Sequence, residues 1–211
     1  MCENTATDTR SVTESGGYMT QTRKTGIAIG VLMLMAFVLY GVGQAMVVAR
    51  PQVGLLMIVL NSMVVTSLGY LFVILLGDSG RVVSSLYLGT RILEAAFLAF
   101  GGFMLYSAAV IPDGTLVAAV SIINDGAYQM AMFSLGIGSV LLFWSMTGKK
   151  QLPVWLGIWG ITGYALLSTG SVLGLWESTM SMYVAIPGGL FEVTFAFWMI
   201  FKGVDSGPVM E

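Results

Sequence analysis

The sequence contains no histidine and only one cysteine, Cys2. Zinc sites, iron–sulfur clusters and His-ligated haem take their ligands mainly from these two residue types. We therefore expect neither a bound metal nor a cofactor. A lone cysteine also excludes an internal disulfide, so the redox compartment and the role of Cys2 do not follow from the sequence.

Charged residues are scarce as well. They make up 9% of the 211 residues, whereas roughly a quarter is usual in soluble domains, and 56% of the residues are hydrophobic. The net charge of −2 and the lack of any long Lys/Arg run exclude a nucleic-acid partner. This composition predicts an all-α, multi-pass membrane protein whose main partner is the lipid bilayer.

Apolar runs long enough to cross a bilayer predict six transmembrane helices in one bundle, residues 26–202. We expect a disordered tail at residues 1–25 and a short tail at residues 203–211. The run 116–123 is too short to span, and residues 124–126 close it off, so we interpret it as an interfacial stretch or a helix extension. The predicted spans are residues 26–48, 53–76, 82–109, 127–146, 154–175 and 180–201.

The distribution of Lys and Arg predicts that both termini face the cytoplasm. An even number of spans puts both ends of the chain on one side. Only Arg50 falls on the opposite side, where the predicted loops instead carry Asp113, Asp125 and Glu177. The basic residues on the terminal side are Arg10, Arg23, Lys24, Arg81, Lys149, Lys150 and Lys202.

Two charges three residues apart, Arg91 and Glu94, fall inside the third apolar span. At about 1.5 Å per residue, Arg91 lies about 15 Å from Arg81, near mid-bilayer, and Glu192 lies equally far from Lys202 in the sixth span. We therefore predict a direct ion pair between Arg91 and Glu192, with Glu94 as a second acceptor. The excess carboxyl group is a candidate proton carrier.

The same residues also have a structural interpretation, in which the trio only fastens the third helix to the sixth. Asn61 in the second span could join the trio or hydrogen-bond across helices, and the second role is favoured. A helix break at Pro187, Gly188 and Gly189, one turn before Glu192, is typical of substrate sites in transporters but is also common in ordinary spans.

Enzyme interpretations lack the necessary side chains. Without histidine a membrane serine peptidase has no usual base, and every aspartate is placed in a tail or a loop, so no aspartyl dyad can form. No lysine lies inside a span to form a retinal Schiff base, and no Walker motif is present. We lean against an enzyme.

Three short patterns lie in the third, fifth and sixth predicted helices. They are Arg91, Glu94 and Ala95; Leu152, Pro153, Trp155, Leu156 and Gly157; and Pro187, Leu190, Phe191, Glu192, Trp198, Lys202 and Gly203. In their order and spacing, these patterns resemble the bacterial membrane-protein family called domain of unknown function 4386. The resemblance covers most of the chain after the tail, and the link at Arg50 and Pro51 is shorter than the outer loop usual in that family. It implies six helices in a bacterial cytoplasmic membrane and no known substrate.

Three functions remain open at this point. The first is a protein that moves or senses a small solute or protons through Arg91, Glu94 and Glu192. The second is a structural or accessory membrane subunit in which these residues are only a fastener. The third is a lipid-modifying enzyme that uses Glu94 or Glu192 as general acid or base, disfavoured because no nucleophile or metal site accompanies them. The sequence gives neither a substrate nor an oligomeric state.

Overall fold

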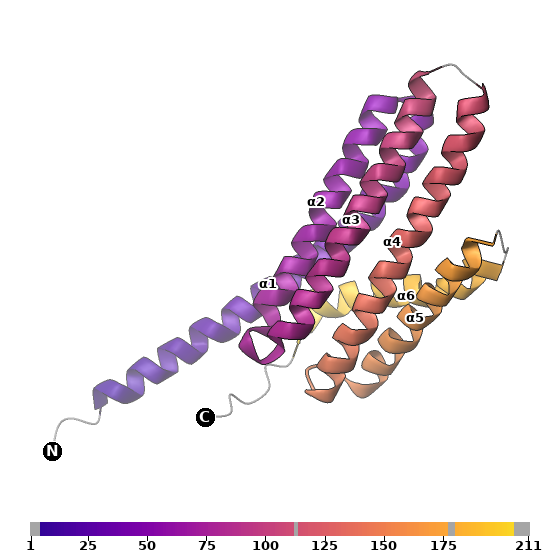
Figure 1. The fold of residues 1–211 in the computed structure, drawn as a ribbon. Coiled ribbons are helices and arrows are strands. Elements are labelled where there is room, and N and C mark those ends of the chain that lie inside the picture. Colours follow the sequence, from indigo (N-terminus) through magenta and orange to yellow (C-terminus); the bar gives the residue numbers. More distant parts are fainter. Residues whose placement is uncertain (1–4, 112–113, 177–179, 205–211) are drawn as a thin grey trace.

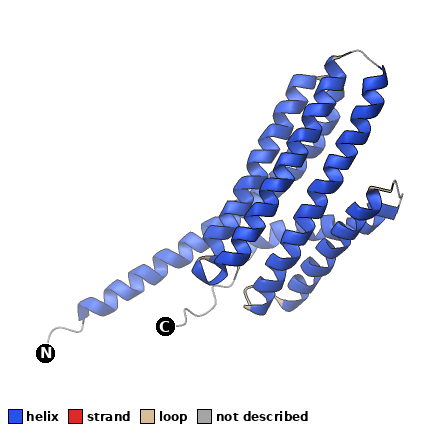
Figure 2. Ribbon diagram, viewed as in Figure 1, coloured by secondary structure: helices blue, strands red, loops and turns tan. Residues whose placement is uncertain are grey.

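The structure is a computed structural model that describes residues 5–111, 114–176 and 180–204. Over these residues it consists of helices and short links, without strands (Figures 1 and 2). Six helices are long and apolar enough to cross a membrane, which confirms the six predicted spans. The elements are α1 Thr5–Ala49, α2 Pro51–Leu76, the short 3-10 helix η1 Asp78–Gly80, α3 Arg81–Val110, α4 Gly114–Gly148, α5 Val154–Gly174 and α6 Met180–Phe201.

Helix α1 begins much earlier than the sequence predicted. It is helical from Thr5, whereas we expected a disordered tail over residues 1–25. No proline precedes Pro51, and extending an existing helix gains one hydrogen bond per residue without a new nucleation cost. The part able to cross a membrane is Gln21–Ala49, and Figure 1 shows the preceding turns extending away from the bundle.

Helix α4 also begins earlier than predicted, at Gly114 rather than near residue 127. The apolar run 116–123 is therefore a helix extension, and Asp125 lies in α4 instead of a loop. The expected stop at residues 124–126 does not form. Near or within a membrane, an interrupted helix leaves backbone groups unpaired, which costs more than the weak helix propensity of these residues.

Neighbouring helices in the chain are neighbours in space. Each helix packs against the next, and α1 packs against α6, so the six helices close into a ring. Close approach depends on glycine: a Cβ at Gly30 would overlap the Ala196 carbonyl of α6. The backbones of Gly163 in α5 and Gly188 in α6 also meet directly. Within the described residues, no extensive packing joins α3 to α6.

The start of the membrane-spanning part of α1 lies beside the end of α6. The Arg23 guanidinium donates hydrogen bonds to the carbonyl oxygens of Met199 at 2.9 Å, Ile200 at 2.5 Å and Phe201 at 3.1 Å. We call this end of the bundle the Arg23 end and the opposite end the Arg50 end. The links α2–α3 and α4–α5 also lie at the Arg23 end, where Lys149 Nζ donates to the Ser79 carbonyl.

Buried aromatic rings fill the half of the bundle nearest the Arg23 end. Phe72, Tyr87, Phe143, Phe191 and Phe195 are each at most 2% exposed, and we call these five the aromatic seal. Phe143 meets Phe191 and Phe195 edge-on, with ring centroids 4.9 Å apart in both pairs. Such rings bury large apolar areas and leave little space for water, so this half of the ring is closed.

Candidate functional site: a polar cavity inside the helix ring

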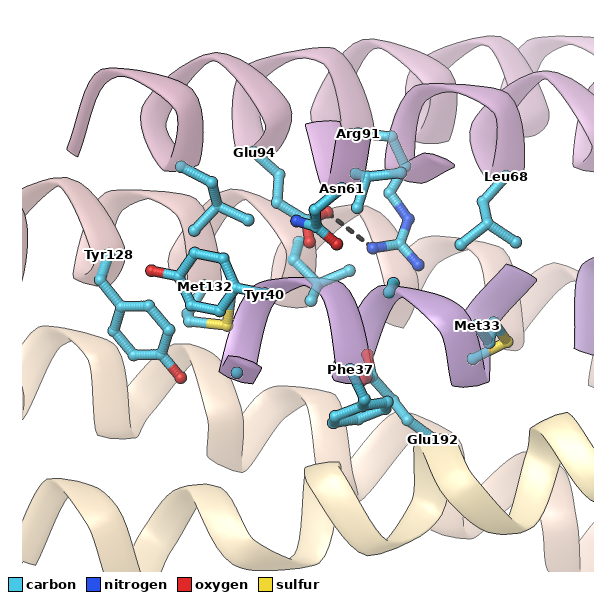
Figure 3. A pocket seen from close by; sticks show the side chains of 15 residues that line it. Met33, Phe37, Tyr40, Asn61, Leu68, Arg91, Glu94, Tyr128, Met132 and Glu192 are labelled. Atoms are coloured by element: carbon cyan, nitrogen blue, oxygen red, sulfur yellow. Dashed lines mark hydrogen bonds and ion pairs between the residues drawn. The ribbon is translucent and has the colours of Figure 1, made fainter. Parts of the chain in front are cut away.

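A cavity of about 200 Å³ lies at the middle of the bundle, on the Arg50 side of the aromatic seal (Figure 3). Five of the six helices contribute to its wall. Its polar lining includes Arg91, Glu94, Glu192 and Asn61, the four side chains that the sequence placed in a polar centre. The remaining lining residues are Met33, Ala36, Phe37, Tyr40, Gly41, Val65, Leu68, Leu98, Tyr128, Met132 and Leu135.

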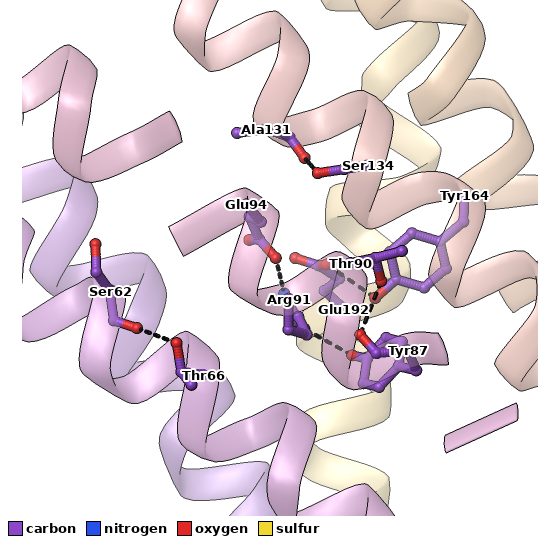
Figure 4. Close-up of polar contacts among 10 residues, drawn as sticks. All are labelled: Ser62, Thr66, Tyr87, Thr90, Arg91, Glu94, Ala131, Ser134, Tyr164 and Glu192. Carbon is purple, nitrogen blue, oxygen red and sulfur yellow. Dashed lines mark hydrogen bonds and ion pairs between the residues drawn. The ribbon is translucent and has the colours of Figure 1, made fainter. Parts of the chain in front are cut away.

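The ion pair at this cavity is formed within α3. Arg91 Nη1 lies 2.6 Å from Glu94 Oε2, and both side chains are 4% exposed (Figure 4). Arg91 Nε donates to the Tyr87 hydroxyl at 2.8 Å, and its guanidinium lies 5.3 Å from the centre of that ring. The guanidinium thus has a carboxylate, a phenol and an aromatic face from its own helix.

The predicted direct ion pair between Arg91 and Glu192 is therefore wrong. Both residues line the cavity, as their matching depths required, but Glu94 holds the guanidinium. The physical reason is local: residues three apart on a helix share a face, so Glu94 reaches Arg91 whatever the tertiary packing. The trio also cannot fasten α3 to α6 in the way predicted, since its only ion pair among the described residues lies within one helix.

Glu192 instead pairs with a neutral group. The Tyr164 hydroxyl of α5 donates a 2.8 Å hydrogen bond to Glu192 Oε1, which joins α5 to α6 (Figure 4). Tyr164 was not predicted as a site residue. Its signal in the sequence was its depth: tyrosine in spans favours the headgroup level, whereas Tyr164 falls in the middle of the fifth span.

Asn61 points its amide toward the cavity. The residue is 1% exposed, and its Oδ1 is buried and lacks a hydrogen bond among the described residues. The bond across helices that we favoured for Asn61 is made by its neighbour, since Ser62 Oγ donates to the Ala95 carbonyl of α3 at 3.0 Å. A buried amide oxygen without a partner is costly, so it is suited to accept a bond from a ligand or water.

Three aromatic side chains form the side of the cavity toward the Arg50 end. They are Phe37 and Tyr40 of α1 and Tyr128 of α4, and the Tyr40 and Tyr128 rings stack with centroids 6.0 Å apart. Gln44 Nε2 donates to the Tyr40 hydroxyl at 2.8 Å and to Asn124 Oδ1 at 3.4 Å, which links α1 to α4. This wall was not predicted, because nothing local in the sequence distinguishes these rings from ordinary span residues.

The helix break predicted at Pro187, Gly188 and Gly189 does not interrupt α6. The helix continues from Met180 to Phe201 with Pro187 inside it. Proline lacks only one backbone donor. Of the two glycines, only Gly188 serves close packing, because a Cβ there would meet the Gly163 carbonyl oxygen at 2.8 Å, whereas a Cβ at Gly189 would meet no atom within 4 Å. These residues thus position Glu192 on a helix held closely against α5.

No group of three or more His, Cys, Asp or Glu side chains in the part of the chain that the structure describes could hold a metal ion. The cavity combines one guanidinium, two carboxyl groups, an amide and phenols in a mainly apolar wall. Such a site can bind a small molecule through charge, hydrogen bonds and aromatic contacts.

Comparison with curated proteins and with solved structures gives no match. A family model, described as a domain of unknown function (DUF4386), matches residues 49–203. The match covers α2 to α6 and includes Arg91, Glu94 and Glu192. The chain therefore belongs to the DUF4386 family.

Proposed function

We propose that this multi-pass membrane protein binds a small solute in the cavity inside its helix ring, in order to transport or sense it. The observation that carries the proposal is the convergence of Arg91, Glu94, Glu192 and Asn61, from three different helices, on one cavity. Charged groups at this depth are costly, and in membrane proteins they commonly mark a ligand or ion pathway.

The geometry of the ion pair supports this proposal over a fastener. A pair within α3 adds no bond between helices, so helix association does not explain why two charges are buried there. The amide oxygen of Asn61 likewise joins no helices among the described residues. Binding of a solute in the cavity gives these buried polar groups a role that helix association does not explain.

One observation favours the alternative, a structural or accessory subunit. The Tyr164–Glu192 hydrogen bond does join two helices, and by itself it gives Glu192 a structural role. In that case Glu192 substitutions lower stability without any effect on a ligand. We also propose that the protein lies in a bacterial cytoplasmic membrane with the Arg23 end inside, and the distribution of basic residues supports this orientation.

A thermal-shift screen with a blocked cavity tests the proposal. Gly41 lines the cavity, and a Cβ there would meet nothing within 4 Å, so we expect Gly41→Leu to fold and to obstruct the cavity where it reaches α1. Gly89 on α3 also has open space around a Cβ but lies outside the lining, which makes Gly89→Leu the matched control.

We expect a solute that raises the melting temperature of the wild type and of Gly89→Leu but not of Gly41→Leu, because a ligand stabilises only the state that binds it. At about 100 times Kd the expected stabilisation is about 2.7 kcal/mol. If every stabilising solute acts equally on the two leucine variants, the cavity is not a binding site and the proposal fails.

A further inference from the structure

The charges around the cavity do not cancel. Arg91 and Glu94 neutralise each other at 2.6 Å, while Glu192 has the neutral hydroxyl of Tyr164 as its hydrogen-bond donor and no Lys or Arg within 4.0 Å among the described residues. The cavity therefore holds one more carboxyl group than cations. The titratable groups that surround Glu192 are Tyr40 of α1, Arg91, Glu94 and Tyr87 of α3, Tyr128 of α4 and Tyr164 of α5.

An excess carboxylate inside a membrane needs a positive charge. Leaving it ionised and unpaired at this depth is strongly unfavourable. Glu192 can remain there in two ways: as the neutral acid, with a proton bound, or as the carboxylate, with a cation in the cavity beside it. The proton and the cation then compete for one carboxyl group.

The wall of the cavity suits an organic cation better than an inorganic one. Phe37, Tyr40 and Tyr128 present aromatic rings, whose faces attract ammonium groups, and Met33 and Met132 are adaptable apolar neighbours. Small metal cations instead need about six oxygen ligands. An anion would meet the excess carboxyl group, and the guanidinium that could hold it is already paired with Glu94.

The cavity reaches the surface of the bundle along α1. A Cβ added at Gly41 would meet no atom within 4 Å, and Phe37 is 43% exposed although both residues line the cavity. Gly41 lies eight residues before the end of α1 at Ala49, which is about 12 Å below the Arg50 end and within the hydrocarbon layer. A ligand with an apolar body can therefore enter from the bilayer, while the aromatic seal closes the Arg23 end.

We infer that the cavity binds an organic monocation with an apolar body, and that the cation displaces a proton from Glu192. The proton leaves to water as the cation takes its place beside the carboxylate, so the charge in the cavity is unchanged. This inference rests on the proposed solute-binding function and specifies its ligand class. It makes the protein a binder, and in a transport cycle an exchanger, of lipophilic cations and protons.

The test uses the full-length protein in lipid nanodiscs with benzyltrimethylammonium as the probe. Calorimetry in weakly buffered solution, between about pH 5 and about pH 9, gives both affinity and proton release. We expect saturable binding that releases about one proton per cation at pH values where Glu192 is protonated in the free protein. At these pH values the affinity for the cation rises with pH, by up to about tenfold per pH unit. At higher pH the affinity no longer changes with pH.

Glu192→Gln keeps the shape of the side chain and removes its charge. We expect it to weaken probe binding at least about tenfold and to abolish proton release. Asp78→Asn is the matched control, because it removes one carboxylate from a side chain that is 98% exposed in the link after α2. It should leave both quantities unchanged. Proton release by the wild type gives a separate readout should the Gln variant fold poorly.

Two further probes separate this inference from the proposed function. Neopentylbenzene has the same shape without charge, and phenylmethanesulfonate has a negative charge. If either binds as well as the cation and is blocked by Gly41→Leu, the cation inference is overturned while solute binding stands. Cation binding without proton release across the whole pH range also overturns it. If the probes bind but Gly41→Leu weakens none of them, the proposed function itself fails, whereas a cation that does not bind at all overturns only the cation inference.

Discussion

Arg91 Nη1 lies 2.6 Å from Glu94 Oε2, one turn along the same helix and deep within the bundle. The two charges are brought together by helix geometry alone, before any packing between helices. Helix α3 can therefore enter the membrane with its guanidinium already paired, which reduces the cost of inserting it. Glu192, in contrast, obtains its partner only from the tertiary structure, in which the Tyr164 hydroxyl donates a hydrogen bond to its carboxyl group.

Arg91→Met and Glu94→Gln should destabilise the protein non-additively. Removing one partner of a buried pair leaves an unpaired charge and costs about 3–5 kcal/mol, so the double variant should cost less than the sum of the single variants. The free energies of unfolding of the wild type, the two single variants and the double variant, measured in mixed micelles, give this coupling. The pair Asp78 and Arg81 has the same spacing at 3.7 Å but is exposed, so its coupling should stay below about 1 kcal/mol. Equal coupling in both pairs would contradict the burial argument.

Tyr164→Phe should lower the free energy of unfolding by about 1–3 kcal/mol, because it leaves the buried carboxyl group of Glu192 without its donor. Tyr70→Phe removes the same hydroxyl from a residue of α2 that is 58% exposed, and it should change stability by less than about 0.5 kcal/mol. Chemical unfolding of both variants makes the comparison. If Tyr164→Phe lowers the free energy of unfolding no more than Tyr70→Phe does, the Tyr164–Glu192 hydrogen bond is not important for stability.

Reporter fusions should place both termini in the cytoplasm. The membrane-spanning part of α1 starts beside the end of α6 at the Arg23 end, and basic residues gather there. Fusions after Lys150 and Glu211 should give cytoplasmic signals, whereas a fusion after Arg50 should give a periplasmic one. A periplasmic signal after Lys150 would reverse this topology.

Deleting residues 1–20 should leave insertion and melting temperature unchanged, because the membrane-crossing part of α1 starts at Gln21. Arg23→Gln in the full chain should instead cost about 1.5–3 kcal/mol, since it removes charge-assisted hydrogen bonds to the last carbonyls of α6. Yield and thermal stability in detergent measure both changes. A large drop after the deletion would show that the first turns of α1 pack on the bundle.

Local rules explain which features could be predicted. The spans follow from the length of apolar runs, so the predicted 180–201 and 53–76 lie close to α6 and α2. The starts of α1 and α4 were less predictable. Residues 1–25 and 116–126 lack strong helix signals, yet the helical parts of both continue into a stable neighbouring helix, because extension is easier than nucleation.

The sequence by itself determined the six spans, the depths of Arg91 and Glu192, and the shared face of Arg91 and Glu94. Depth is only one coordinate, and it does not fix which way a side chain points around its helix. Only the tertiary structure decided that Glu192 accepts a hydrogen bond from Tyr164. It also decided that the aromatic rings of Phe37, Tyr40 and Tyr128 line the same cavity as Arg91 and Glu192. The physical reason is that these neighbours depend on contacts such as Gly30 with Ala196, between helices far apart in the chain.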